Sequence, residues 1–197
     1  VKVDLPKVFI DIQKFLLLFL KERFEKLKKW GILQRRDIKY VGKSDLLQLQ
    51  AELRGRIAQG EKGFAVWNAI SLLAEIMKIY HALELLETQG IVSLHRYFEK
   101  LIAESRISKT KAIKSIMSDS NFKSAMIKAR ILHEERVEHP KLVELQRIVE
   151  NEVKENTKIM IFNQYRDNAL DVIQKLNKIP NIKAKIFVGQ QKKNETG

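Results

Sequence analysis

The sequence predicts a mainly α-helical fold, a helical bundle followed by a short α/β segment. Three features indicate this fold. Apolar residues recur at every third or fourth position through residues 1–136, the period of a helix with one buried face. Three prolines and eight glycines leave few helix breaks. Two short apolar runs then alternate with helical stretches, as in α/β units. We therefore expect two parts, residues 1–136 and 137–197.

Residues at the expected helix ends support the bundle. Asp4 is a suitable N-cap and Pro6 fits the first turn, where a missing N–H costs nothing. Ser44 is the expected cap of the second helix, and Asp119 or Ser120 that of the sixth. The expected helices run from Asp4 to Gly31, Ser44 to Gln59, Phe64 to Gln89 and Val92 to Ala103, with two shorter ones after Ser108 and Asp119.

The second part alternates helix and strand. Helices are expected at about residues 140–155 and 166–176. The apolar runs at 158–162 and 184–188 are typical of buried strands. Two strands are too few for a stable sheet, so we expect this α/β domain to be truncated. The polar residues 189–197 are expected to be a frayed tail.

Composition favours a cytoplasmic protein that meets polyanions. The chain has 37 Lys and Arg against 24 Asp and Glu, a net charge of +13. Such a charge favours nucleic acid, although a lysine-rich surface can also serve solubility or heat tolerance. The longest apolar run has about six residues and a membrane span needs roughly 20, so we expect no membrane partner. The absence of cysteine excludes disulfides and thiol catalysis.

No motif indicates self-contained catalysis, a metal site or a cofactor site. Gly42-Lys43-Ser44 ends like a phosphate-binding loop, but Asp37 occupies the position of its first glycine and no strand precedes it. His133-Glu134 begins like a zinc-protease motif, but Val137 replaces the second histidine. Ser44 is therefore read as a helix cap and His133 as an ordinary histidine.

A basic segment is the best candidate for a binding site. Its cations flank a single acid, Asp119, on the two short helices. They are Lys109, Lys111, Lys114, Lys123, Lys128 and Arg130. Such a face could bind a DNA backbone without reading its sequence, because neutralised phosphates release condensed counterions. The alternative is a solvated surface.

A second basic cluster surrounds Trp30. It consists of Lys26, Lys28, Lys29, Arg35, Arg36 and Lys39. Trp30 could offer a stacking surface to a base, but a core position is the favoured interpretation.

Four stretches resemble a known helicase family. Residues 80–90, Tyr-His-Ala-Leu-Glu-Leu-Leu-Glu-Thr-Gln-Gly, resemble the insertion domain of fork-remodelling superfamily-2 helicases of the archaeal Hef and Fanconi-anaemia M types. Residues 139–142, 159–167 and 184–190 are similar to the start of the second RecA-like domain of these helicases. Within them, Phe162 to Arg166 resembles helicase motif IV.

The resemblance implies a thumb-like helical insertion domain over residues 1–136 and the N-terminal part of helicase domain 2 over 137–197. Motif IV lies near the bound strand in this family, which makes Gln164, Tyr165 and Arg166 candidate DNA contacts. The Arg166 guanidinium can hold a phosphate with two N–H groups. Alternatively, Tyr165 packs and Arg166 caps a helix or pairs with Asp167.

The function implied is that of a DNA-binding fragment of an ATP-dependent helicase that remodels forked or branched DNA in repair. Its partners would be that DNA and the parent's motor domains, which would bind ATP and Mg²⁺. This chain lacks the ATPase motifs, so we expect it to be inactive alone. Two alternatives are a structural spacer or protein-docking module, and the insertion domain of a double-stranded-RNA translocase.

Overall fold

The computed structural model describes residues 3–33, 41–61, 63–108, 110–153, 157–163 and 166–187, and these form eight helices. The chain divides into two compact units, Asp4–His139 and a second made mainly of Pro140–Gly197. The division falls between residues 139 and 140. The helices of the first unit are α1 (Lys7–Lys29), α2 (Lys43–Ala58), α3 (Phe64–Thr88), α4 (Ile91–Ile107), α5 (Lys111–Ser118) and α6 (Ser120–Glu134).

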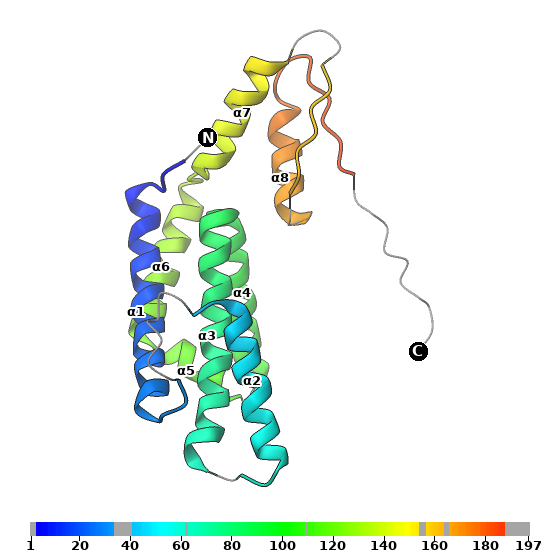
Figure 1. Ribbon diagram of the computed structural model, residues 1–197. Coiled ribbons are helices and arrows are strands. Elements are labelled where there is room, and N and C mark those ends of the chain that lie inside the picture. The colour runs from blue at the N-terminus through cyan, green and yellow to red at the C-terminus, as the bar shows by residue number, and fades with distance from the viewer. Residues whose placement is uncertain are drawn as a thin grey trace. The chain divides into compact units, whose positions relative to one another are not determined.

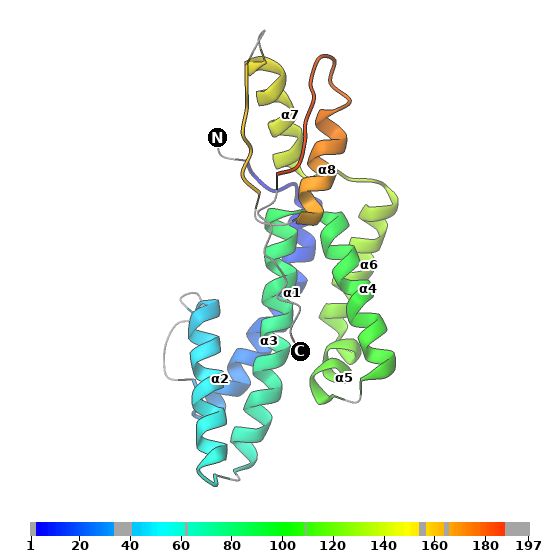
Figure 2. The ribbon, with the colours of Figure 1, turned by 90° about the vertical axis from the view of Figure 1, so that its right-hand side faces the viewer.

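The first unit is a helical bundle organised around α3. This helix contacts α1, α2, α4 and α5, while α6 packs against α1 and α4 (Figures 1 and 2). A helix with four neighbours must be apolar on several sides. Accordingly, α3 buries consecutive pairs such as Leu72 with Leu73 and Leu85 with Leu86. The predicted mainly helical bundle is confirmed.

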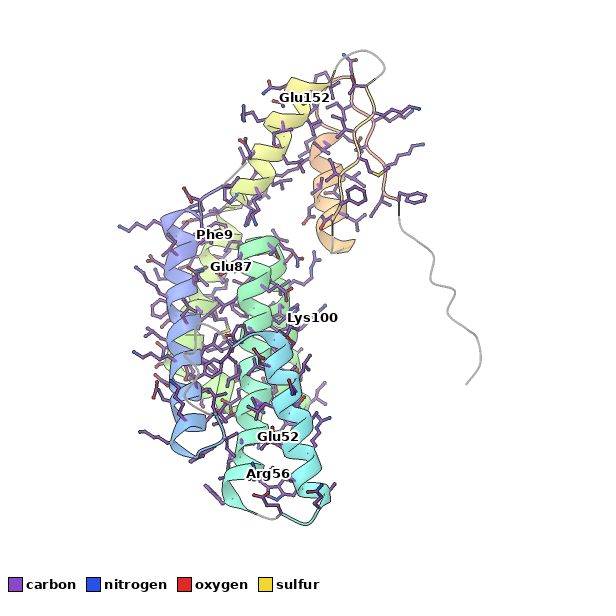
Figure 3. All side chains as sticks on the ribbon, viewed as in Figure 1. Phe9, Glu52, Arg56, Glu87, Lys100 and Glu152 are labelled. Atoms are coloured by element: carbon purple, nitrogen blue, oxygen red, sulfur yellow. The ribbon has the colours of Figure 1, made fainter. Side chains whose placement is uncertain are left out.

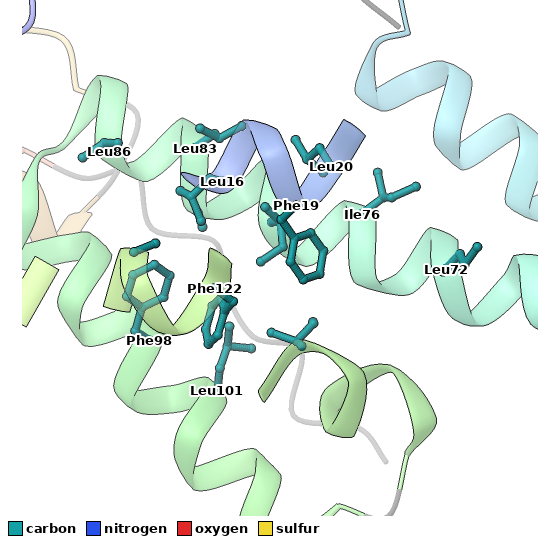
Figure 4. Close-up of a cluster of buried hydrophobic side chains, with 14 of the residues drawn as sticks. Leu16, Phe19, Leu20, Leu72, Ile76, Leu83, Leu86, Phe98, Leu101 and Phe122 are labelled. Carbon is teal, nitrogen blue, oxygen red and sulfur yellow. The ribbon is translucent and has the colours of Figure 1, made fainter. Parts of the chain in front are cut away.

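Side chains from four helices meet in the core of the bundle (Figure 4). Leu16 and Phe19 of α1 and Ile76 of α3 are fully buried. The rings of Phe98 in α4 and Phe122 in α6 meet edge to face, with centroids 5.1 Å apart. Aromatic pairs of this kind stabilise a core beyond the area they bury.

A charged network is buried within this apolar core. Arg23 of α1 and Glu75 of α3 are 4% and 2% exposed. Arg23 Nε donates to Glu75 Oε2 at 3.1 Å, and its Nη1 donates to Asp119 Oδ2 at 2.5 Å. Ser115 Oγ of α5 also donates to Glu75 Oε2, at 2.9 Å. The network therefore joins α1, α3, α5 and the start of α6.

The observed helix caps agree only partly with expectation. Asp119 caps α6 as predicted, since its Oδ1 accepts from the N–H of Phe122 at 3.0 Å. The cap predicted at Ser44 is wrong: Gly42 is the N-cap of α2, and its N–H donates to Asp45 Oδ2. The cap predicted at Asp4 is also wrong, because α1 begins only after Pro6.

The turn between α3 and α4 is closed by a histidine from the end of the bundle. Gly90 has φ +91°, a conformation that favours glycine. A Cβ at Gly90 would lie 2.8 Å from the Cβ of His139, which is buried. The rings of His139 and Phe9 of α1 meet edge to face, with their centroids 5.7 Å apart. The last residue of the bundle is thus fixed to the start of α1 and the α3–α4 turn.

The second unit contains α7 (Pro140–Glu152) and α8 (Arg166–Leu176), which share a small apolar core. The strands predicted at 158–162 and 184–188 are wrong for the described residues, which are extended there but form no strand. Phe162 and Phe187 are 90% and 98% exposed. A strand needs ladder partners, and the described residues supply none to these segments. Val188 and the tail 189–197 lie outside the described residues.

Candidate nucleic-acid interface

The α5 helix exposes two of the predicted cations. It buries Ala112, Ile113 and Ile116. Because Lys111 and Lys114 are three residues apart, they share a face of α5, and both are exposed. The apolar pattern of the sequence therefore places them at the surface.

The α6 helix continues the basic surface. It buries Phe122, Ala125 and Ala129 and exposes Lys123 and Arg130. These two cations are two helical turns apart, about 10 Å along the axis. Only Asp119 separates the end of α5 from the start of α6, so Lys114 and Lys123 lie on consecutive helices that meet at one corner.

The predicted cations differ in how far their charge is compensated. Lys128 Nζ lies 3.5 Å from Asp11 Oδ2, and Arg130 lies 3.8 Å from Glu134. Lys111 donates to the neutral side chain of Asn68. Lys114 and Lys123 form no ion pair within the described part of the chain. Lys111, Lys114 and Lys123 thus retain the charge that a phosphate backbone would meet.

Other predicted site residues are not characterised by the structure. Lys109, Gln164 and Tyr165 lie outside the described residues. Arg166 is the first residue of α8, in the second unit. The motif IV contacts therefore stay a prediction.

Trp30 packs in the bundle as expected. It is half-buried against the core, and its ring meets that of Phe64 with centroids 6.4 Å apart and planes at 75°. Lys26 and Lys29 are exposed beside it at the end of α1. Lys28 is half-buried, and the other three cations of this cluster, Arg35, Arg36 and Lys39, lie outside the described residues.

Two exposed aromatic residues were missed by the sequence analysis. Phe64 and Trp67, in the first turn of α3, are 76% and 55% exposed. The helical period could have predicted the exposure of Trp67, because Trp67 is out of phase with the buried positions of α3, which begin with Val66 and Ala69. A tryptophan out of phase with the buried positions of an amphipathic helix faces solvent.

A family model matches the bundle. Residues 8–139 fit the family described as "Putative ATP-dependent RNA helicase, helical bundle". The chain belongs to this helicase helical-bundle family. Its predicted resemblance to Hef-type and Fanconi-anaemia M-type superfamily-2 helicases is confirmed. The chain is 24% identical over 226 residues to the Fanconi anemia group M protein of Gallus gallus, covering 95% of this chain and 11% of that protein.

Similar helical bundles occur in larger helicases. The chain is 33% identical over 199 residues to a protein of Methanocaldococcus jannaschii that is named as an ATP-dependent RNA helicase. The alignment covers 100% of this chain and 24% of that protein. It is 26% identical over 195 residues to the ATP-dependent DNA helicase fml1 of Schizosaccharomyces pombe, covering 95% of this chain and 23% of the relative. The chain thus spans about a quarter of the length of these relatives.

A crystal structure shows the same fold. The Pyrococcus furiosus Hef helicase domain superposes with a TM-score of 0.85 at 33% sequence identity. The match covers 98% of this chain and 40% of that structure. The bundle therefore has the fold of the corresponding part of Hef.

A histidine pair joins two helices of this helicase bundle. The rings of His95 in α4 and His133 in α6 stack with centroids 4.2 Å apart and planes at 23°. Burial lowers the pKa of His95, and the neighbouring His133 and Arg130 add to this effect. Glu99 and Glu134 oppose it. His133 thus contacts another histidine, and no group of three metal-ligating side chains occurs among the described residues.

We expect the stability of the bundle to fall as the pH drops below about 6.5, the usual histidine pKa. The unfolded state then binds a proton at His95 that the folded state takes up only at lower pH. Urea unfolding followed by tryptophan fluorescence at pH 7.5 and 5.5 measures this dependence, and His95→Gln should reduce it. Equal pH dependence in both proteins would contradict the role of His95.

The structure also bears on the membrane prediction. None of the described helices combines the length and the apolar character that crossing a bilayer requires.

Proposed function

We propose that the bundle binds the phosphate backbone of forked or branched DNA on behalf of an ATP-dependent superfamily-2 helicase. Lys111, Lys114 and Lys123 would make the contacts. The observation that carries this proposal is a group of exposed, uncompensated ammonium groups on two helices that meet at one corner. ATP and Mg²⁺ would bind motor domains of the parent protein.

The chemistry of these side chains suits a backbone. A lysine ammonium is a point charge on a flexible stem, which attracts phosphate without selecting a base. Lys128 and Arg130 would add less, because binding must compete with Asp11 and Glu134 for their charge. The named relative fml1 is a DNA helicase, which favours DNA as the polyanion.

Replacing both Lys114 and Lys123 with glutamine should weaken binding to a four-way junction by about tenfold in low salt. The slope of log affinity against log salt should fall by about 2, one for each lost phosphate contact. Fluorescence anisotropy with a labelled junction, a linear duplex and a single strand measures both quantities.

The matched control removes the same charge from another helix. Lys7 and Lys14 are exposed on α1, so Lys7→Gln with Lys14→Gln lowers the net charge equally. If both double variants weakened binding equally, affinity would depend on net charge alone. The surface formed by Lys111, Lys114 and Lys123, the α5–α6 surface, would then not be the site. Weak binding that neither double variant changes would leave a spacer or protein-docking role.

The choice between DNA and RNA is tested in the same titration. The relative from Methanocaldococcus jannaschii is named as an RNA helicase, whereas fml1 is named as a DNA helicase. A double-stranded RNA of equal length therefore belongs in the comparison. Tighter binding to RNA than to every DNA would overturn the proposal in favour of a double-stranded-RNA translocase.

A further inference from the structure

An aromatic surface lies at the start of α3. Phe64 and Trp67 are one helical turn apart, so their rings project from the same side of the helix. Trp30 contacts Phe64 edge-on from the end of α1. The turn that joins α2 to α3 lies at the end of the bundle opposite Phe9, where Figure 3 shows Arg56. These rings therefore belong to the outer tip of the bundle.

A lysine is held beside these rings. Asn68 follows Trp67, and its Nδ2 donates to the carbonyl of Phe64 at 2.7 Å. Its Oδ1 accepts from Lys111 Nζ of α5. The Asn68 amide is thus oriented by the backbone of α3. It positions the Lys111 ammonium next to the first turn of α3, which carries Phe64 and Trp67 and is called the aromatic turn below. Because asparagine is neutral, the lysine keeps its full charge.

The surroundings of the rings favour an anionic ligand. The first turn of α3 has no acidic residue. The preceding carboxylate, Glu61, accepts from Arg56 Nε and Nη2 through both of its oxygens, each at 2.7 Å. The last turn of α1, which Trp30 follows, carries three lysines and no acid. An exposed indole in a cationic setting combines the two features that bind single-stranded nucleic acid.

We propose that Trp67, Phe64 and Lys111 bind an unpaired nucleotide, its base stacked on Trp67 and its phosphate at the Lys111 ammonium. This inference rests on the proposed function, because Lys111 also belongs to the α5–α6 surface. It specifies which part of the forked or branched DNA is bound: unpaired bases that adjoin a duplex. A closed linear duplex offers its bases only at the ends.

Tryptophan fluorescence tests stacking directly. The chain has two tryptophans, so Trp30→Phe leaves Trp67 as the sole reporter. Titration of the full 197-residue chain with a short oligothymidylate should quench Trp67, with the same midpoint as the anisotropy change of the labelled strand. A blunt duplex at equal phosphate concentration should quench it much less.

Substitutions separate stacking from simple apolar contact. Trp67→Leu should weaken binding of the single strand roughly tenfold, whereas Trp67→Phe keeps an aromatic face and should lose less. Asn68→Leu should also weaken binding, because Lys111 loses its positioning partner. Leu47→Ala is the control, since Leu47 is similarly exposed on α2. Circular dichroism checks that each variant remains helical.

The outcomes distinguish this inference from the function on which it rests. Absence of quenching, with Trp67→Leu binding forks as wild type does while the Lys114 and Lys123 variant is weakened, would overturn nucleotide stacking and keep backbone binding. No effect of either variant would overturn both. If Trp67→Leu instead abolished self-association in sedimentation without changing DNA affinity, the aromatic turn would be an interface between copies.

Discussion

Replacing Arg23 with alanine is expected to destabilise the bundle by about 3–5 kcal/mol. The guanidinium of Arg23 lies between two carboxylates, Glu75 and Asp119, whose side chains are almost entirely buried. Removing the guanidinium leaves two buried carboxylates with no cation, and water cannot reach them to take its place. The loss should therefore exceed that of most single substitutions.

The two carboxylates are held in place by other hydrogen bonds, so they cannot readily move toward solvent. Asp119 also caps α6 through Oδ1, and Glu75 also accepts from Ser115. Moving either toward solvent would break a second hydrogen bond. Arg23 further lies over the ring of Phe19, 3.6 Å from its centroid, so alanine also removes packing.

Urea unfolding followed by tryptophan fluorescence measures this loss. Both tryptophans lie in the unit Asp4–His139, so the signal reports on the bundle alone. Lys21→Ala is the control, because Lys21 is exposed on the same helix. A loss below about 1 kcal/mol for Arg23→Ala, the range of surface ion pairs, would contradict the role assigned to the network.

Gly90→Ala is expected to destabilise the bundle by about 3 kcal/mol, from backbone strain and overpacking together. The positive φ of Gly90 disfavours any side chain, and the new methyl group would lie within 3.3 Å of three atoms of His139. Since His139 is buried and contacts Phe9, it has no room to retreat without disturbing α1.

Gly60→Ala separates the two contributions, because Gly60 has φ +94° with open space where its Cβ would stand. This control should cost about 1–2 kcal/mol, the backbone part alone. The same unfolding assay compares the two variants. Equal losses would show that His139 yields to the methyl group and does not close the turn.

The sequence predicted the features that depend on neighbours within a few positions. The helix phases and the Asp119 cap follow from local spacing, and the exposure of Lys114 and Lys123 follows from the apolar positions of α5 and α6. Compensation of Lys128 by Asp11 could not be predicted, because these residues are remote in sequence and meet only when α1 packs on α6.

Other features that the sequence did not predict have the same physical origin. Burial of Arg23 with Glu75 is a tertiary feature that no helical pattern shows, since charged residues usually stand at the surface. The two predicted strands have the right residue types, but strand formation requires partners along the edge. Trp67 was overlooked because an aromatic residue in a helical pattern is most often part of a core.

The bundle carries its aromatic turn and the exit of its chain at opposite ends. The chain leaves the bundle at His139, which contacts Phe9 near the start of α1 and Gly90 just after the end of α3. Trp67 lies in the first turn of α3, at the other end of that helix. The 25 residues of α3 span about 37 Å. The aromatic turn is therefore held about the length of α3 away from the residue at which the chain leaves the bundle.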